Sequence, residues 1–504
     1  MIITINIVWF KRDLRVNDNQ VLSDASKIGH VIPLYIIEPD LWQQPDLSYR
    51  QYCFLQESLK DLQKSLSLLG QPLIIKVGNV LDVFSEILNT HNVTKVWSHE
   101  ETWNGWTYER DKGVAKYLKE KGIPWRQIPQ NGVIRNIDCR DGWAKKWFIT
   151  MQKPLCGAPP FLSKTQIIID DIPTPESLGL QNDGALLRQR GSREKGLDLL
   201  DNFLNLRGEY YTKEMSSPVT AYESCSRISP YLAFGLISLR EVFQITQLRI
   251  DTIKNLPRGQ KGKWPSAMRS FSGRLRWHCH FIQKFEDQPS IEFSNMHFMY
   301  DGIRENDFNN DYFVAWKNGQ TGYPMIDASM RALRKHGWIN FRMRAMLVSF
   351  ASYHLWLHWP KVAIFLASQF TDYEPGIHYS QIQMQSGTTG INSIRIYNPI
   401  KQGVDNDPDG EFIYHWIPEL ANMPKEFIHM PWKNPEYLNG YPLPIVDEKV
   451  ARKNAADKIY SVRKSMGHML ESNIIVQKHG SRKSPFKSNV AVKKKDNNQG
   501  ELPL

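Results

Sequence analysis

The stretch GQTGYPMIDASMRALRKHGW, residues 319–338, contains its own start and stop signals. It opens with a glycine-containing turn. Pro324 then stands where a helical pattern begins, a position that suits its missing amide hydrogen and fixed φ angle. Gly337 follows the last helical position, which is where helices most often place glycine. The stretch therefore predicts a helix between Pro324 and Gly337, entered and left through tight turns.

The same residues form the long ungapped pattern G-x-T-G-x-P-x-x-D-A-x-M-R-x-L-x-x-x-G-W, which resembles the cryptochrome/photolyase family. Near the amino terminus, WFKRDLRVNDN (residues 9–19) is similar to the family's W-F-[RK]-R-D-L-R-x-x-D-N. The resemblance covers about residues 1–463, and the chain looks like a divergent bacterial-type DNA photolyase. It implies FAD in a helical domain, absorption of blue light, and either repair of pyrimidine dimers in DNA or signalling.

Length and composition predict a globular protein of two or more domains. The chain has 504 residues, of which 41% are hydrophobic, enough for a sizeable core. No stretch approaches the roughly 20 apolar residues of a membrane span. The start also lacks the charged region and cleavage site of a signal peptide. We therefore expect a cytoplasmic protein that does not bind a membrane, and we expect a monomer.

Charge and cysteine usage bear on partners and metals. The net charge of +11 favours binding to phosphate backbones, so the expected partner is DNA containing pyrimidine dimers. The five cysteines are scattered and form no C-x-x-C pair, which argues against an iron–sulfur cluster. The run WHCH at 277–280 resembles a metal site, but adjacent helical residues point in different directions. No metal is predicted.

The order of elements predicts an α/β domain followed by a helical one. Short β-branched runs at 3–10, 32–37, 73–77 and 93–98 alternate with helical patterns at 50–69 and 80–90. This alternation is typical of a doubly wound parallel sheet. We predict four regions: an α/β antenna-type domain (1–130), a proline-rich connector (131–195), an all-α FAD-binding catalytic domain (196–466) and a basic tail (467–504). The tail carries seven Lys/Arg against three Asp/Glu and is expected to be disordered.

The cofactor-binding residues are carried over from the family's motifs. The run CSRIS at 225–229 offers hydroxyl and amide groups at a helix start, which suits a phosphate, although an ordinary helix cap has the same pattern. Arg344 is expected to pair with Asp372, because either charge alone would be costly when buried. The full set that the resemblance implies is Tyr211, Cys225, Ser226, Arg227, Ile228, Ser229, Phe271, Arg274, Arg344, Asp372, Tyr373, Glu374 and His378.

Residues expected to contact DNA or take part in the reaction come from the same motifs. The catalytic set is Arg274, Trp277, Trp359 and His378, the last aligned with the position that faces flavin N5. The DNA-contacting set is Arg274, Trp277, Phe341, Arg342, Met384, Asn398, Lys401 and Gln402.

Several of these positions depart from the family. Arg274 stands where repair enzymes have Glu or Gln, Phe341 replaces an Asn, and Met384 replaces a Trp. An Arg has donors only and cannot reproduce the acceptor of a protonated carboxyl group. It can still donate to thymine carbonyls and stabilise negative charge on a dimer.

The family's three-tryptophan electron chain is interrupted. Its middle member is present as Trp359, but the flavin-proximal position is Ile382 and the outer one aligns near Asn306. An isoleucine side chain cannot carry an electron hole. Other aromatic residues offer a different route, namely Trp356, Tyr373 and Tyr379.

The hypothesis is therefore blue-light-driven repair by electron transfer from reduced FAD to a flipped-out pyrimidine dimer, the activity of a deoxyribodipyrimidine photo-lyase. The alternatives are a cryptochrome-type photoreceptor that binds FAD without repair, and a flavin-containing nucleic-acid-binding protein without catalysis. Residues 106–111, WTYERD, do not match the family's pterin-binding pattern, so an antenna chromophore stays open and unnamed. Lesion type and strandedness of the DNA also stay open.

Overall fold

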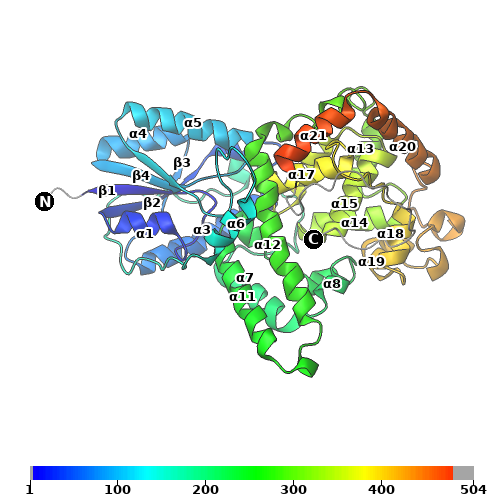
Figure 1. Cartoon of the computed structure of the whole chain (residues 1–504), viewed down its shortest axis with the longest axis horizontal. Helices are drawn as coiled ribbons and strands as arrows, with labels where there is room; N and C mark the ends of the chain where they lie inside the picture. The colour runs from blue at the N-terminus through cyan, green and yellow to red at the C-terminus, as the bar shows by residue number, and fades with distance from the viewer. Residues whose placement is uncertain (1–3, 481–504) are drawn as a thin grey trace.

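The computed structural model describes residues 4–480. Figure 1 shows a sheet-containing amino-terminal part at the left and a larger helical part at the right. The 24-residue helix α12 (Trp264–Asp287) runs along the middle of the molecule. This arrangement confirms the predicted fold class, an α/β domain followed by an all-α domain. Within residues 4–480 no helix combines the length and apolar character that a membrane crossing requires.

The amino-terminal part is built on five parallel strands in the order β3-β2-β1-β4-β5. Four of them were predicted, and the short, polar β5 was missed because its WRQI sequence has no β-branched run. The strands are β1 (Ile5–Phe10), β2 (His30–Ile37), β3 (Ile74–Val77), β4 (Val93–His99) and β5 (Trp125–Ile128). The order reverses between β1 and β4, which is where doubly wound sheets place their ligands, beyond the carboxyl ends of the strands.

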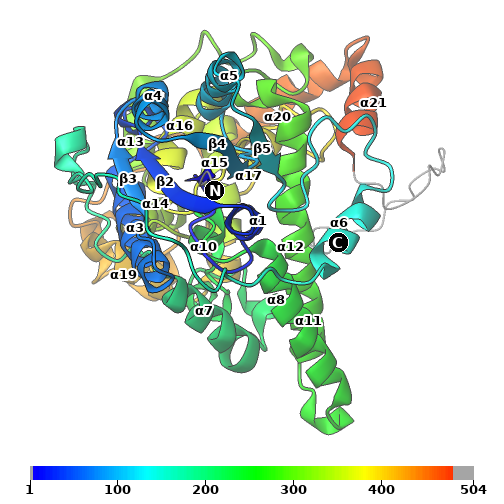
Figure 2. The same cartoon turned by 90° about the vertical axis from the view of Figure 1, so that its left-hand side faces the viewer.

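Helices cover both faces of the sheet, as Figure 2 shows. Successive residues of β1 point to opposite faces. Thus Trp9 packs with Phe84 on one side, and Phe10 belongs to the large core on the other. The helices of this part are α1 (Gln20–Ser26), α2 (Pro39–Trp42), α3 (Tyr49–Leu68), α4 (Val80–Thr90) and α5 (Gly105–Glu120).

The connector contains little regular structure. Its longest element is α6 (Trp143–Gln152), and a single 3-10 turn, Glu176–Leu178, follows among its prolines.

The rest of the described chain is mainly helical, and its large core continues into the amino-terminal part, while a small separate cluster holds Tyr300, Tyr353, Ala455 and Ile459. Two short π-helical segments, Phe203–Arg207 and Phe350–His354, follow directly on α-helices in this part of the chain. Its helices besides α12 are α7 (Arg193–Asn202), α8 (Tyr211–Glu214), α9 (Ala221–Ser224), α10 (Ser229–Ala233), α11 (Leu239–Asn255), α13 (Asn310–Asn318), α14 (Pro324–His336), α15 (Phe341–Ser349), α16 (Trp359–Gln369), α17 (Pro375–Ser386), α18 (Pro399–Asn406), α19 (Glu411–Trp416), α20 (Glu448–Lys464) and α21 (His468–His479).

Helix α14 confirms the prediction made from residues 319–338. It begins at Pro324 and ends before Gly337, whose φ of 65° is in the left-handed region. A Cβ atom on Gly337 would lie 2.3 Å from Thr371 Oγ1, so glycine is needed for space as well as for φ. At the other end, buried Asp327 accepts hydrogen bonds from the Thr321 amide at 2.8 Å and the Gly322 amide at 3.0 Å. The motif thus fixes the turn that precedes the helix.

The expectation of a disordered tail is wrong for residues 468–479, which form α21. His479 is buried, and its Nε2 lies 2.7 Å from Gln288 Oε1, just beyond the end of α12. His468 stacks on His297 with ring centroids 4.2 Å apart. These contacts form between segments far apart in sequence, so charge along the tail did not reveal them. The remainder of the predicted tail, 481–504, lies outside the described residues.

Docking of α21 predicts acid sensitivity. Burial, together with the charges of Lys284, Lys478 and Arg140, lowers the pKa of His479 to about 3. In the unfolded chain this histidine takes up a proton near its ordinary pKa of 6.5, so the stabilisation present at pH 7 is lost as the pH falls from about 6.5 toward 3. At pH 5 the loss is about 2 kcal/mol. We expect limited proteolysis to cut α21 faster at pH 5 than at pH 7. His479→Gln should abolish most of this pH dependence, and an unchanged pH profile would contradict the assignment.

Candidate cofactor site

Arg344 and Asp372 form the ion pair that the sequence predicted. The Nη1 and Nη2 atoms of Arg344, on α15, lie 3.0 and 2.9 Å from the two carboxylate oxygens of Asp372, which precedes α17. Such a bidentate pair fixes geometry as well as charge. The Arg344 Nε atom donates to the Ile339 carbonyl at 2.8 Å, and the Phe370 ring lies 4.1 Å from the guanidinium. The pair therefore ties α15 to the start of α17.

Arginine side chains gather at the loop of residues 225–229, which we call the cofactor corner. Residues 225–229 join α9 to α10, and Arg207 donates to the Ser226 carbonyl at 3.0 Å and to the Cys225 carbonyl. Burial raises the pKa of the Cys225 thiol to about 12, and the charges of Arg207, Arg227 and Arg274 oppose that rise. Arg207 braces the loop, since its Nη atoms also donate to the Leu199 and Glu223 carbonyls, whereas Arg227 and Arg274 add positive charge that suits a diphosphate. Sequence reasoning missed Arg207, because nothing local distinguishes it from a solvent-exposed arginine.

The loop itself is held in an unusual backbone conformation. Arg227 has a φ of 56°, uncommon for a residue with a side chain. Its guanidinium stacks over the Tyr222 ring at 4.0 Å, and Gln189 donates to its carbonyl at 2.8 Å. Ile228 is buried, whereas Ser226 and Ser229 are half-buried. The apolar residue of the loop therefore packs into the core, while its two serines stay partly accessible.

Helix α12 brings Arg274 to the same corner. Burial raises the pKa of Tyr211 to about 12, and the positive charge of nearby Arg274 opposes this rise. The Tyr211 ring packs edge-on against Phe203 and Phe271. Phe271 and Arg274 are three residues apart on one helix and share a face. The structure thus joins Arg274 to Tyr211 and the 225–229 loop.

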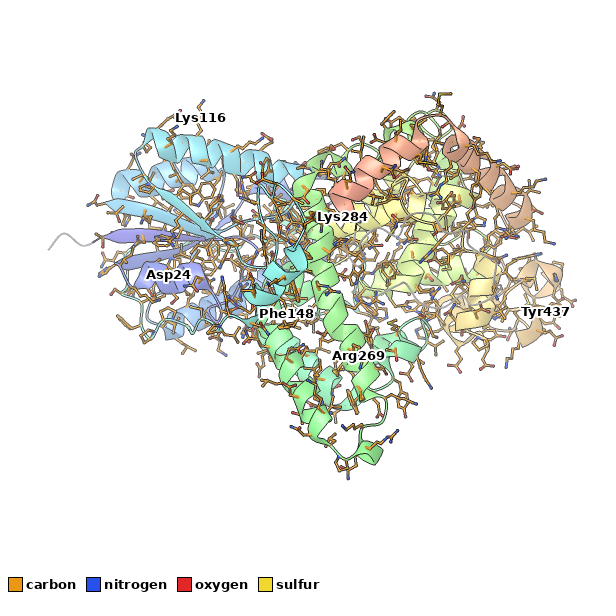
Figure 3. All side chains as sticks on the ribbon, viewed as in Figure 1. Asp24, Lys116, Phe148, Arg269, Lys284 and Tyr437 are labelled. Carbon is orange, nitrogen blue, oxygen red and sulfur yellow. The ribbon has the colours of Figure 1, made fainter. Side chains whose placement is uncertain are left out.

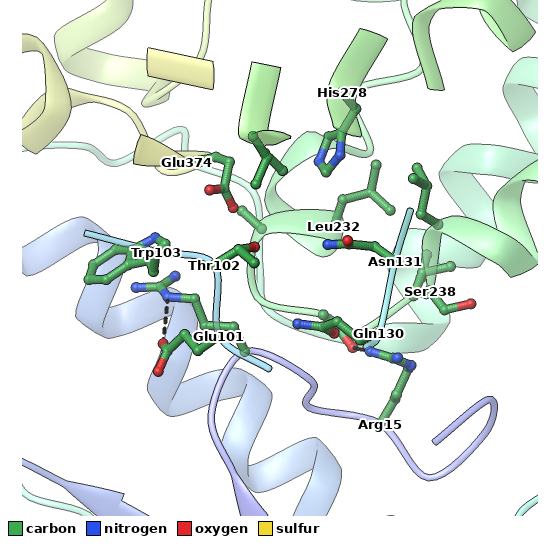
Figure 4. Close-up of a pocket in the computed structure, with 16 residues that line it drawn as sticks. Arg15, Glu101, Thr102, Trp103, Gln130, Asn131, Leu232, Ser238, His278 and Glu374 are labelled. Carbon is green, nitrogen blue, oxygen red and sulfur yellow. Dashed lines mark hydrogen bonds and ion pairs between the residues drawn. The ribbon is translucent and has the colours of Figure 1, made fainter. Parts of the chain in front are cut away.

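A cavity of about 40 Å³ lies where the two parts of the molecule meet (Figure 4). Arg12 and Glu101, beyond the carboxyl ends of β1 and β4, face Glu374 and His278 from the helical part. The Arg12 guanidinium lies 3.5 Å from the Trp103 ring. The cavity is therefore at the point where the strand order reverses, and its helical wall includes the predicted cofactor residue Glu374.

Three side chains that line this cavity carry a polar atom with no hydrogen-bond partner within residues 4–480. The atoms are Glu374 Oε1, His278 Nδ1 and Trp103 Nε1, and all three are buried. Burial raises the pKa of Glu374 to about 8 and lowers the pKa of His278 to about 4, so at pH 7 these two titratable groups are largely neutral. Buried polar groups are normally paired. The three atoms are therefore available to a bound molecule or to ordered water.

His378 lies among aromatic rings. Its Nε2 is 2.9 Å from the Ala363 carbonyl, which can only accept, so Nε2 carries the hydrogen and Nδ1 is left as the acceptor. Burial lowers the pKa of His378 to about 4, which keeps it neutral at pH 7. The rings of Tyr373 and Tyr379 each lie 5.3 Å from the imidazole. Trp359 is fully buried, 6.4 Å from the Tyr379 ring.

The predicted DNA-contacting residues occupy different environments. Trp277 is half-buried on α12 and packs edge-on against His280 at 4.7 Å. Phe341, at the start of α15, is 41% exposed, and Arg342 Nη2 is 3.5 Å from Ser216 Oγ. Met384 is half-buried on α17. The structure brings Arg274 and Trp277 onto one face of α12, three residues apart.

The remaining three predicted DNA-contacting residues, Asn398, Lys401 and Gln402, lie at the start of helix α18. Asn398 caps the helix by accepting from the Lys401 amide at 2.9 Å. Gln402 is buried, whereas Lys401 is exposed and pairs with Asp405 at 3.2 Å. Asn398 thus has a structural task, and Lys401 is the member of the three that is open to a phosphate.

The run at 277–280 does not converge on one point. His278 lines the cavity, Cys279 is fully buried, and His280 Nδ1 lies 2.9 Å from Arg140 Nη2. Residues 4–480 contain no group of three or more His, Cys, Asp or Glu side chains placed to hold a metal ion.

Part of the stretch at 106–111 is committed to buried ion pairs on α5. Arg110 contacts Glu38 at 2.8 Å and Asp111 at 2.9 Å. Asp111 in turn contacts Lys11 at 2.8 Å. These side chains satisfy one another next to the sheet.

Comparisons with known proteins relate both parts of the chain to photolyases and cryptochromes. Residues 6–142 match a family described as DNA photolyase, and residues 271–461 match the FAD binding domain of DNA photolyase. Cryptochrome-2 of Arabidopsis thaliana is 30% identical over 500 residues, covering 91% of this chain and 79% of its own length. The deoxyribodipyrimidine photo-lyase of Vibrio cholerae is 28% identical over 479 residues, covering 88% and 97%.

Solved structures agree in fold. A bacterial class III photolyase from Agrobacterium tumefaciens superposes with a TM-score of 0.79 at 25% identity, covering 92% of this chain and 99% of its own. An archaeal photolyase from Sulfolobus tokodaii, solved with two FAD molecules, superposes with a TM-score of 0.76 at 27% identity, covering 91% of this chain and 100% of its own. The residues present fit such a cofactor: the positive charge of Arg227 and Arg274 at the 225–229 loop suits its diphosphate, and the unpartnered Glu374 and His278 atoms suit a polar ring edge.

Proposed function

Because the chain belongs to the cryptochrome/photolyase family and carries its FAD-binding domain, we propose that it repairs pyrimidine dimers in DNA by light-driven electron transfer from reduced FAD. In this proposal the 225–229 loop, which Arg207 braces, holds the diphosphate together with Arg274, and Arg344 with Asp372 fixes the wall beside the flavin. FAD supplies the electron chemistry, and the side chains supply placement and charge.

The observation that carries the proposal is the arrangement of α12. Phe271, Arg274 and Trp277 succeed one another at three-residue spacing, so they form one continuous face of the helix. Arg274 adjoins the cofactor corner through Tyr211, and Trp277 offers an aromatic surface one turn further on. A base rotated out of the DNA stack needs such a surface beside the electron donor. Arg274 then stands where negative charge develops on the lesion.

The test is illumination of the chemically reduced protein with an oligonucleotide that contains a single pyrimidine dimer. We expect blue light to remove the dimer and darkness to leave it, with cyclobutane and 6-4 lesions assayed separately. Trp277→Phe keeps an aromatic surface and should retain part of the repair, whereas Trp277→Ala should lose it. A flavin-containing, reduced protein that binds the DNA but leaves both lesions intact would overturn the proposal.

That negative result would favour the photoreceptor alternative, in which FAD is bound without repair. Two observations support this alternative. Arabidopsis cryptochrome-2 is as similar to the chain as the photolyases are. In addition, Phe341 occupies a position where repair enzymes carry a polar lesion contact, and 41% of its surface is exposed.

DNA binding should weaken steeply with salt. Each phosphate contact releases counterions, which contributes about −0.9 to the slope of log K against log salt on duplex DNA. Removing residues 481–504 deletes six Lys/Arg and two Asp/Glu and leaves α21 intact. We expect a shallower slope and lower affinity for all DNA, with the ratio of lesion to undamaged binding unchanged. Fluorescence anisotropy over a salt series measures both, and an affinity independent of salt would contradict the prediction.

A further inference from the structure

A second cavity lies between helix α20 and the residues that follow the π-helical segment Phe350–His354. Figure 1 shows α20 at the end of the molecule opposite the sheet. The volume of this cavity is about 390 Å³, which is in the range of small-molecule sites. None of the residues assigned above to the cofactor or to DNA lines it. It is therefore separate from the site already described.

The backbone takes two uncommon conformations where it borders this cavity. The segment Phe350–His354 is π-helical, a form that occurs mostly as single turns and frequently at functional sites. Trp356 follows with a φ of 54°, in the left-handed region that large side chains seldom adopt. Its indole Nε1 donates to the Ile303 carbonyl at 3.1 Å, which fixes the ring. Backbone strain of this kind gathers at binding sites, where the surrounding contacts enforce it.

Two cationic side chains lie beside the Trp356 ring. The Arg304 guanidinium is 4.4 Å and Lys458 Nζ is 4.5 Å from the ring centroid. Arg304 is 1% exposed, and within residues 4–480 its Nε and Nη2 atoms have no hydrogen-bond partner. Burial lowers the pKa of Arg304 to about 10, which leaves it charged at pH 7. A buried guanidinium normally has an acidic partner, because its desolvation is costly.

The carboxylates near the cavity do not compensate this charge. Asp447 accepts from a backbone amide of the first turn of α20 at 2.9 Å. Glu448 is buried, with its Oε1 atom 2.9 Å from Arg452 Nε. Glu305 accepts from the backbone amide of Arg304 at 2.9 Å. In the described part of the chain none of the three lies within 4.0 Å of either cation beside the indole. The indole therefore stands in uncompensated positive charge.

These features together select a planar aromatic anion. An aromatic ring laid against the Trp356 indole buries apolar surface and gains the attraction between stacked rings. Leu355, Val446 and Val450 supply apolar walls around that position. An acidic group on the ring would meet Lys458, whose side chain is exposed and lines the same cavity. An aliphatic anion would lose the stacking, and an uncharged aromatic molecule would leave the positive charge uncompensated.

We propose that this cavity binds a small planar aromatic molecule that bears a carboxylate, with its ring on Trp356 and its carboxylate paired with Lys458. The site depends neither on the repair of DNA nor on FAD, since no residue of the cofactor corner takes part in it. A ligand held there joins the segment after Phe350–His354 to α20 and stabilises the folded chain as its concentration rises.

The test is isothermal titration calorimetry of the full-length, flavin-containing protein with three probes. The probe 2-naphthoate has both the ring and the charge, 2-naphthamide has the ring alone, and cyclohexanecarboxylate has the charge alone. We expect 2-naphthoate to bind saturably at one site. The other two should bind at least about fivefold more weakly, because each lacks one of the two contacts. Added salt should weaken the binding of 2-naphthoate and leave that of 2-naphthamide unchanged.

Four variants assign the binding to this cavity. Trp356→Leu should weaken 2-naphthoate binding about tenfold, and Lys458→Gln should weaken it about fivefold. Val450→Asp places a negative charge at a position that is 57% exposed, so it should weaken binding of the anion and spare 2-naphthamide. Lys453→Gln is the matched control, because Lys453 is exposed on another side of α20 and does not line the cavity. It should bind like the wild type.

Crystals soaked in 6-bromo-2-naphthoate locate the ligand directly, since the anomalous signal of bromine should appear against Trp356. Absence of saturable 2-naphthoate binding would overturn the proposal, as would equal affinity for 2-naphthamide. A bromine signal confined to another cavity, or equal losses in Lys453→Gln and Lys458→Gln, would do the same. Circular dichroism checks the fold of Trp356→Leu. The variants at 450 and 458 change exposed side chains, so they test the site even if that protein does not fold.

Discussion

Asp372→Ala should yield a protein that loses its flavin. The substitution leaves the Arg344 guanidinium without the carboxylate that it contacts at 3.0 and 2.9 Å. Breaking one side of a buried pair costs about 3–5 kcal/mol. We expect about 3 kcal/mol in the free energy of unfolding, because one quarter of the Arg344 side chain stays exposed. Urea titration followed by circular dichroism measures the stability, and acid extraction measures the flavin content.

The chain offers a matched control for this change. Arg331 and Glu419 form another bidentate pair, at 2.8 and 2.9 Å, but their side chains are 20% and 31% exposed and lie outside the candidate site. Glu419→Ala should cost about 1 kcal/mol or less and keep the flavin. Equal flavin loss in both variants would show that Asp372 acts only through general stability. Full flavin content in Asp372→Ala would contradict the placement of the site.

Arg274→Ala should weaken flavin binding. Arg274 adjoins Tyr211 and contributes, with Arg207 and Arg227, to the positive charge around Cys225. A hydrogen bond to a charged group contributes about 1.5–3 kcal/mol, so the dissociation constant of FAD should rise about 10- to 100-fold. Reconstitution of the apoprotein with FAD, followed by fluorescence quenching, measures this directly. Arg274→Lys keeps the charge but loses the planar set of guanidinium donors. Its FAD affinity should lie between that of the wild type and that of Arg274→Ala.

Arg269 provides the comparison on the same helix. Figure 3 labels it on α12, and its side chain is exposed. Arg269→Ala should leave FAD affinity unchanged and alter DNA binding at most through its lost charge. If Arg274→Ala instead keeps full FAD affinity but lowers repair per bound dimer, the arginine acts on the lesion. Uniformly weaker binding of all DNA would assign it to a phosphate.

Local signals explain what could be predicted. The turn, proline and glycine of residues 319–338 fix α14 because each acts over one or two helical turns. The alternation of apolar runs and helical patterns was sufficient for the doubly wound sheet, except for the polar edge strand β5. The Arg344–Asp372 pair was also predicted, although from resemblance and not from periodicity.

Contacts between distant segments were beyond such reasoning. Helix α21 was taken for part of a charged tail, because its docking depends on His479 meeting Gln288 and His468 meeting His297. Arg207 joins Arg227 and Arg274 only after α9 and α12 have come together. Residue patterns along the chain carry no information about which side chains will share a buried space.

The sequence was sufficient to predict the family and the two-domain architecture, and the resemblance predicted departures from the family at Arg274, Phe341, Ile382 and Met384. The tertiary structure alone decided what surrounds them. It set Asp46 against Tyr373 and Arg12 opposite Glu374, across the boundary between the two parts. The physical reason is that charge and proton affinity depend on burial and on neighbours in space. Glu374 has a raised pKa because the fold removes it from water, which no feature of its local sequence specifies.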